Sequence, residues 1–462
     1  MLSKTVWIVR VLAVILAGFC TFYLGTELVQ IFTSNNSKEL AVRSLRQNDY
    51  SQFIEKGSTA FFSLPNIKQK LIASVHSANE QLMKALSDSS TVRNTLAPDN
   101  AASFPALGGT SVRRAVLAFF PPNNSKFVSE LKWFFLSWGY MRSKESSNMK
   151  TDLILFTEPS YVEKLASDFG CNREVRKSFQ DSVACIVLPH VPLSKRKIPE
   201  NEDPSPLLDY SNYVDSMLIL SEFQHTAAYD ILIRSDLDTF LTPGFSDWTL
   251  KGDVAIVTGR GGYSSENSSR RLTWIAEKKL GLKDSGRRNL GSTWYGKAGV
   301  MVATAKLTVA VMDWLDTQEF SDYEKGNNGV DGWPYWHWPV ILLYGGHIAL
   351  NQIPSNHILE YKEGEVEMDK ATSATNAMGR GTKHLHCFHG EGFFAKFKFY
   401  AGEYKDMDVT KYAAMDTAQA YAAVIALSSD RMTIAELVEY VNSKEDMTSG
   451  AWKRLTVESS TS

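Results

Sequence analysis

Two neighbouring acidic residues, Asp236 and Asp238, have the type and spacing that suit a divalent cation. They follow residues 231–233 (Ile-Leu-Ile), which are typical of a buried strand. Side chains at positions i and i+2 of an extended segment project to the same side, so both carboxylates can reach one ion. Mg²⁺ and Mn²⁺ prefer oxygen ligands and keep water or substrate phosphate in their coordination shell. We therefore expect a metal and diphosphate site here; an acidic turn or a helix cap is the alternative.

A histidine-rich segment, residues 384–390 (His-Leu-His-Cys-Phe-His-Gly), supplies further candidate ligands. On a straight strand His384 and His386 share a face, so His386 and His389 are not expected to bind one ion together. We expect His386 first and His389 second as a metal ligand; a surface cluster of histidines is the alternative. Lys396 follows closely and could reach a phosphate, although solvated lysines are commoner.

The run Asp236-Leu237-Asp238, after an apolar strand, resembles the DxD signature of nucleotide-diphospho-sugar transferases of the GT-A fold. This resemblance covers roughly residues 111–400. It implies a nucleotide-diphosphate sugar as donor, Mn²⁺ or Mg²⁺ as cofactor, and a glycan, protein or lipid as acceptor. Carried over, Asp236 meets the ribose or a metal-bound water, Asp238 coordinates the metal, and a late histidine near a glycine completes the site. The match is imperfect, because Cys387 stands three residues before Gly390, where the family commonly has its histidine.

Other residues are weaker candidates for binding the donor and the acceptor. Arg234 could face the nucleotide or simply pair with an acid. Residues 258–263, which include Arg260, and residues 294–299 contain glycines, and glycine lets a backbone approach a ligand closely. Residues 329–338 are dense in aromatic side chains that could stack on sugar rings, and Asp331 there could act as a general base. A Gly-Pro turn packed by aromatic residues explains that segment equally well.

The pattern of apolar segments predicts an α/β fold with a mostly parallel, doubly wound sheet. The resemblance implies that this sheet is GT-A-like and Rossmann-like. Expected strands are residues 114–120, 152–156, 183–188, 230–234, 252–258 and 298–303. Expected helices are residues 125–140, 161–169, 210–227, 272–280 and 307–317, with a helical tail beyond residue 408. Thr433 and Glu436 have the spacing of a capping box in that tail.

The N-terminus is expected to anchor the chain in a membrane. Residues 6–32 are long enough to span a bilayer, with Lys4 and Arg10 on the cytosolic side and the bulk of the chain in the lumen. A cleaved signal peptide is the alternative. We expect a tail and anchor in residues 1–32, a stem in 33–110, a catalytic domain in 111–400 and a helical extension in 401–462. This organisation, with glycosylation sequons at Asn35, Asn123 and Asn267, favours the Golgi or another secretory membrane.

Composition narrows the remaining possibilities. A net charge of −2 argues against a nucleic-acid binder that relies on broad electrostatics. Of the four cysteines, Cys171 and Cys185 could form a disulfide or remain two buried thiols. Two rival functions stay open. One is a metal-dependent phosphatase with an aspartyl nucleophile, although Thr239 stands one place early for its motif. The other is a catalytically inactive carbohydrate-binding or scaffold protein of the same fold.

Overall fold

The computed structural model divides the chain into two units, Met1–Ile67 and Lys68–Ser462, and the second contains the elements discussed below except residues 64–67 at the start of the first helix. The described residues are 64–94, 111–122, 124–175, 182–198, 205, 207, 210, 212–326, 335–387, 393–412 and 415–443. The expected anchor, residues 6–32, therefore lies outside the described residues, as do Asp331 and His389.

A seven-stranded sheet forms the centre of the second unit, with the strand order β3-β2-β1-β4-β7-β6-β8. All neighbouring strands are parallel except β7, which is antiparallel to both β4 and β6. The expected mostly parallel α/β sheet is thus confirmed. In chain order the strands are β1 (Val112–Phe119), β2 (Met149–Thr157), β3 (Cys185–Pro189), β4 (Ile231–Arg234), β6 (Ile256–Arg260), β7 (Leu290–Lys297) and β8 (Ile358–Leu359).

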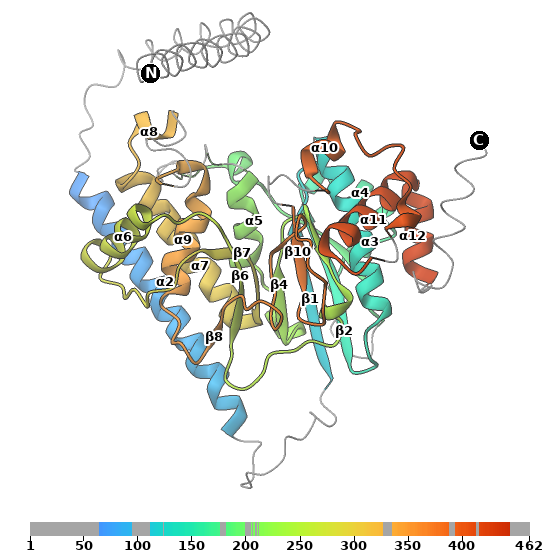
Figure 1. Ribbon diagram of the computed structural model, residues 1–462. Helices are drawn as coiled ribbons and strands as arrows, with labels where there is room; N and C mark the ends of the chain where they lie inside the picture. Colours follow the sequence, from blue (N-terminus) through green and yellow to red (C-terminus); the bar gives the residue numbers. More distant parts are fainter. Residues whose placement is uncertain are drawn as a thin grey trace, which may run out of the picture. The chain divides into compact units, whose positions relative to one another are not determined.

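Helices cover both faces of this sheet, as a doubly wound fold requires (Figure 1). Alternate residues of β1 point into two different cores: Ala115 and Leu117 into one, Val116 and Ala118 into the other. The first core is closed by α2 (Leu64–Asn94), α5 (Asn212–Ser221), α6 (Glu266–Trp274), α7 (Ala298–Gln318) and α9 (Ile341–Leu350). The second is closed by α3 (Ser125–Ser143), α4 (Val162–Asp168), α11 (Ala418–Arg431) and α12 (Ile434–Ser443). The short helices α8 (Asp322–Gly326) and α10 (Lys396–Tyr400) lie in connections.

Parts of the expected stem and C-terminal extension contribute to the two cores. From the stem, Val75, Leu82 and Leu86 of α2 are buried in the first core. From the extension, α11 and α12 pack on α3 in the second core. Within the described residues, α7 is long and apolar enough to cross a membrane, but 78% of its most apolar window is buried, as in a core helix.

A small second sheet brings the histidine segment to the acidic pair. Its order is β5 (Thr239–Leu241), β10 (His384–His386) and β9 (Lys370–Ala371). β10 runs antiparallel to β5, with His386 opposite Thr239. Because β5 begins directly after Asp238, this pairing places His386 beside that carboxylate even though 148 residues separate the two in sequence.

One expected element is wrong. Residues 298–303 were expected to form a strand, but they are the first turns of α7, and the strand is the preceding segment, β7. A short apolar run without polar alternation does not distinguish a buried strand from a buried helix, and α7 is buried along most of its length.

The structure decides between the two alternatives for the cysteines and confirms the capping box. Cys171 and Cys185 form a disulfide that joins the segment after α4 to the start of β3. Thr433 and Glu436 form the expected capping box: the Thr433 amide donates to the Glu436 carboxylate at 2.6 Å, and the Glu436 amide donates to Thr433 Oγ1 at 3.3 Å.

Candidate active site

The acidic pair lies in the loop between β4 and β5, at the carboxyl end of the parallel strands. The Ser235 amide continues the sheet pairing by donating to the Leu117 carbonyl at 3.0 Å. Leu237, between the two acids, is buried, and the indole of Trp133 donates to its carbonyl at 3.0 Å. Burial of Leu237 on one side turns both neighbouring carboxylates to the other, which is the arrangement that the i, i+2 spacing predicted.

Asp236, Asp238 and His386 come together as a candidate cation site. One ligand atom from each residue can be chosen so that all three lie within 4.8 Å of one another, and all three residues are partly exposed. Two carboxylate oxygens and an imidazole nitrogen suit Mn²⁺ well, and Mg²⁺ through the oxygens. The residues present therefore fit the cation that the sequence predicted.

Asp236 is held in place by its own strand. The guanidinium of Arg234 binds both carboxylate oxygens, Nη2 at 2.8 Å from Oδ1 and Nη1 at 3.0 Å from Oδ2. Ser292 on β7 also donates to Oδ2, at 3.2 Å. Arg234 is buried and donates in addition to the carbonyl of Ser292. Of the two roles considered for Arg234, the structure shows pairing with an acid.

Asp238 is surrounded by positive charge. Lys396 Nζ donates to Asp238 Oδ2 at 2.6 Å, and His386 Nε2 lies 3.5 Å from Oδ1. Burial raises the pKa of the Asp238 carboxyl, but the charges and hydrogen bonds of His386 and Lys396 lower it further, so the net shift is well below the ordinary value. Asp238 is therefore ionised at neutral pH and is available to a cation.

His386 lies between two carboxylates. Its Nε2 faces Asp238, and its Nδ1 lies 3.4 Å from Asp369 Oδ1. Burial lowers the pKa of His386, but the charge of Asp238 and the contacts with Asp369 outweigh it and raise the pKa to about 10. The imidazole is thus protonated at neutral pH, and a metal bound at Nε2 would have to displace the Nε2 proton.

A buried carboxylate that the sequence analysis missed, Glu130 on α3, lies behind Lys396. Lys396 Nζ is 4.0 Å from Glu130 Oε1, and the hydroxyl of Tyr400 donates to the same oxygen. Burial, reinforced by the charge of Asp238, raises the pKa of Glu130 to about 7, against the opposing effects of Tyr400 and Lys396. The signal was present in the sequence: Glu130 is the one acid in residues 125–140, three and four residues from the apolar Phe127 and Phe134.

The remaining candidate site residues either lie outside the group around Asp236 and Asp238 or fall outside the described residues. Arg260 is exposed at the end of β6, with its guanidinium carbon 5.8 Å from the centre of the Tyr361 ring. Gly259 beside it faces the carboxylate of Asp369. Asp331 and His389 lie outside the described residues, so their proposed roles stay predictions.

The chain matches one known protein family over most of its length. Residues 109–452 of the 462 match the family described as "Domain of unknown function (DUF7164)". The chain is a member of the DUF7164 family. No curated protein is similar in sequence to this DUF7164 member.

Several solved structures resemble this DUF7164 chain at low identity. The WbbM bifunctional glycosyltransferase is 12% identical with a TM-score of 0.34, and the match covers 63% of this chain and 48% of that one. Mouse xyloside xylosyltransferase 1 is 11% identical with a TM-score of 0.30, over 54% of this chain and 86% of that one. The glycosyltransferase GlyE of Streptococcus pneumoniae TIGR4 is 8% identical with a TM-score of 0.32, over 73% and 64%. The DUF7164 chain thus spans about half the length of WbbM. The fold of the DUF7164 chain itself follows from its strand order, as described above.

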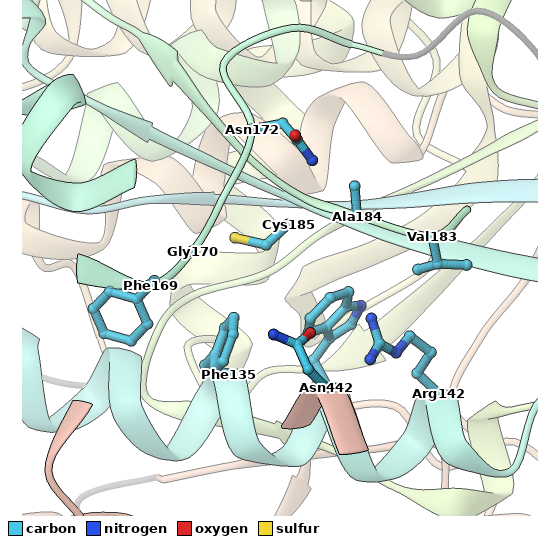
Figure 2. Close-up of a pocket in the computed structure, with 10 residues that line it drawn as sticks. Phe135, Arg142, Phe169, Gly170, Asn172, Val183, Ala184, Cys185 and Asn442 are labelled. Carbon is cyan, nitrogen blue, oxygen red and sulfur yellow. The ribbon is translucent and has the colours of Figure 1, made fainter. Parts of the chain in front are cut away.

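A small pocket of the DUF7164 domain lies away from the acidic pair (Figure 2). It has a volume of about 150 Å³ and is lined by residues of α3, α12 and the start of β3, among them Trp138, Arg142, Cys185 and Asn442. Cys185 begins β3, so this pocket lies near the amino end of that strand, whereas Asp236 and Asp238 follow the carboxyl end of β4. None of the candidate site residues lines it.

Proposed function

We propose that this DUF7164 protein is a glycosyltransferase that transfers a sugar from a nucleotide-diphosphate sugar to a glycan, protein or lipid acceptor. In this proposal Asp236, Asp238 and His386 hold a divalent cation, Mn²⁺ or Mg²⁺. The observation that carries it is the convergence of these three side chains, from segments far apart in sequence, at the carboxyl end of β4. In open α/β sheets this end of the strands is where ligands bind.

The surrounding residues suit the handling of a diphosphate. A bound cation would neutralise the charge of the diphosphate as the nucleoside diphosphate leaves. Lys396 places an ammonium group at 2.6 Å from Asp238, where it can also donate to a phosphate oxygen. Arg234 fixes Asp236 through one hydrogen bond and a second ion-pair contact, which keeps that carboxylate oriented before a ligand arrives.

The cellular part of the proposal rests on the sequence. An anchor in residues 6–32 would place the catalytic domain in the lumen of the Golgi or another secretory compartment. The disulfide between Cys171 and Cys185 supports an oxidising compartment. Asn267, in one of the three sequons, is exposed. Asp331 remains our candidate for the base on the acceptor side. Of the aromatic residues beside it, Trp336 is buried between Phe320 and Tyr344, as the alternative of a packed turn expected.

The sequence motif argues against a phosphatase. Its threonine should stand four residues after the aspartyl nucleophile, where this chain has Phe240, and Thr239 comes one place early. The inactive scaffold is distinguished by experiment, because a site built only for binding would hold a donor without cleaving it.

A donor screen tests the proposal. Full-length protein in detergent is incubated with a panel of nucleotide-diphosphate sugars and with Mn²⁺, Mg²⁺ or EDTA, and released nucleoside diphosphate is measured. We expect release with at least one donor, dependent on the cation. Release of phosphate from monoesters would instead support the phosphatase. Donor binding without release of nucleoside diphosphate would support the inactive scaffold. Release that persists in EDTA would refute the metal part of the proposal.

A further inference from the structure

A second buried carboxylate, Asp369, stands behind the candidate metal site. It precedes β9 and is 3% exposed. Its backbone has φ of 56°, in the left-handed region that few residues other than glycine adopt. Such a conformation persists where the surrounding structure enforces it, and it often marks a functional position.

The carboxylate of Asp369 joins the two sheets. On one side, Oδ1 lies 3.2 Å from His384 Nδ1 and 3.4 Å from His386 Nδ1, so both histidines of β10 turn the same ring nitrogen toward it. On the other side, Oδ2 accepts a hydrogen bond from the Thr293 amide of β7 at 3.2 Å. Asp369 therefore ties β10, which carries the histidines, to the central sheet.

Two glycines make room for this carboxylate. A Cβ atom at Gly259 would lie 2.0 Å from Asp369 Oδ2, and one at Gly291 would lie 2.4 Å from the same oxygen. Both distances are far below contact distance, so neither β6 nor β7 could carry a side chain here without displacing Asp369. Gly259 was expected to let a ligand approach the backbone; in the structure a side chain of the protein itself occupies that space.

The two histidines then face different partners. His384 turns Nε2 to the hydroxyl of Ser235 at 3.0 Å, inside the protein. His386 turns Nε2 toward Asp238 at 3.5 Å, on the side of the candidate cation site. A histidine that binds metal through one ring nitrogen usually donates its other N–H to a carboxylate or carbonyl, which fixes the tautomer and makes the ligand more basic. Asp369 has the position and charge for that role.

We propose that Asp369 is the positioning residue of the metal site: it holds the Nδ1 proton of His386 and thereby presents the Nε2 lone pair to the cation. This inference rests on the proposed function. It adds that the glycines at 259 and 291 serve the metal ligand indirectly, by admitting the carboxylate that orients it. Asp369 does not itself touch the cation.

The test compares Mn²⁺ binding to full-length wild type and Asp369→Asn, followed by the loss of the free Mn²⁺ signal in electron paramagnetic resonance. Asparagine has the same shape, but its amide can donate to His386 Nδ1 and so drive the proton to Nε2, where it blocks the metal. We expect Mn²⁺ affinity to fall roughly 10- to 100-fold. In a His386→Gln background the same substitution should change affinity less than about twofold, because no ring remains to be oriented.

A matched control is Asp152→Asn. Asp152 is equally buried, and its carboxylate is bound by Arg113, Tyr229 and the Ala184 amide. This substitution should lower the unfolding temperature at least as much as Asp369→Asn and leave the Mn²⁺ affinity of the folded protein unchanged. An equal loss of affinity in both variants would mean that Asp369 acts only through stability, and the inference would be overturned.

The remaining outcomes separate this inference from the proposed function. Wild type that does not bind Mn²⁺ would refute the metal part of the function and the inference with it. If wild type binds Mn²⁺ and Asp369→Asn binds it equally well, the inference alone is refuted. Should Asp369→Asn fail to fold, nitrogen-15 spectra of histidine-labelled wild type with Cd²⁺ still decide. We expect one histidine that is metal-bound at Nε2, is protonated at Nδ1 and disappears in His386→Gln; binding through Nδ1 would overturn the assignment.

Discussion

Charged side chains gather at both ends of the central sheet, but the two groups differ in how the hydrogen-bond donors of their basic residue are used. At the amino end, the five N–H groups of Arg114 reach the side chains of Thr151 and Glu145 and the carbonyls of Phe245, Ser246 and Trp248. At the carboxyl end, Lys396 donates to Asp238 at 2.6 Å and stands 4.0 Å from Glu130. A fixed guanidinium fork with every donor used suits a permanent contact, whereas a flexible ammonium can exchange its partner for a ligand.

The comparison teaches that burial of charge alone does not mark a functional site. Both groups contain buried charges, yet at the carboxyl end the buried Glu130 lies close to the partly exposed Asp236 and Asp238, and the charge of Asp238 helps to raise the pKa of Glu130 to about 7. Acids held close together against their mutual repulsion are typical of sites that receive a cation. The amino end should therefore govern stability and the carboxyl end binding, which the following substitutions test in order of decreasing effect.

Arg114→Met should give the largest effect, and on stability alone. It leaves the buried carboxylate of Glu145 without the guanidinium that now lies 2.9 Å away, which we expect to cost roughly 3 to 5 kcal/mol. Chemical denaturation measures the loss. Arg196→Met, at the more exposed pair with Glu222, should cost only about 0 to 1 kcal/mol. A loss of donor affinity in folded Arg114→Met would contradict the proposal that the amino end of the sheet governs stability and not binding.

Asp238→Asn should act in the opposite way. The amide keeps the shape of the side chain but removes the charge that faces the cation, so we expect cation-dependent nucleotide release to fall roughly 100- to 1,000-fold. Calorimetric titration of donor with Mn²⁺ should show the loss of binding directly, while the circular dichroism spectrum stays that of wild type. Unchanged affinity would remove Asp238 from the site.

Glu130→Gln should change how stability depends on pH. Because the pKa of Glu130 is raised from 4.5 to about 7, the folded protein keeps a proton that the unfolded chain releases, and stability should fall as pH rises through this interval. The fall amounts to at most about 3 kcal/mol at ~1.4 kcal/mol per pH unit. Denaturation between these pH values should show it in wild type and not in Glu130→Gln. The same slope in both proteins would contradict this account, and Glu222→Gln is the exposed control.

Lys396→Met should give the smallest effect, with opposite signs for two ligands. Removing the ammonium that competes for Asp238 should raise the affinity for Mn²⁺ alone several-fold, while the affinity for donor should fall about tenfold through the lost contact with phosphate. Titration calorimetry with each ligand measures both. Lys398→Met, which changes an exposed neighbour, should alter neither. A fall in both affinities would show that Lys396 supports the site rather than competing for it.

The sequence predicted the elements that carry a local signal. The strand before Asp236 ends in polar residues, the i, i+2 spacing turns both carboxylates to one side, and the alternation in residues 384–386 predicts that His384 and His386 share a face. In the structure both histidines indeed contact the same carboxylate.

The partners of these residues could not be predicted, because they depend on pairings between distant segments. Asp369 stands in a polar stretch before a strand of two residues, too short to show any alternation, and reaches His386 only through the small second sheet. Glu130 reaches Lys396 only through the packing of α3 beside the segment that follows β10. Nor could the sequence show that Gly259 faces Asp369 rather than a ligand.

The disulfide between Cys171 and Cys185 has a consequence for how the protein should be produced. Cys185 begins β3, the strand at one edge of the seven-stranded sheet, and Asn172 is hydrogen-bonded to that strand on both sides of Ile186, at 2.8 and 2.7 Å. The disulfide holds the segment at Asn172 along the outer edge of β3, which would otherwise be open. Open sheet edges can pair with strands of other molecules. Material made in a reducing cytosol would lack this protection and would be expected to aggregate through β3, so an oxidising host is the appropriate source.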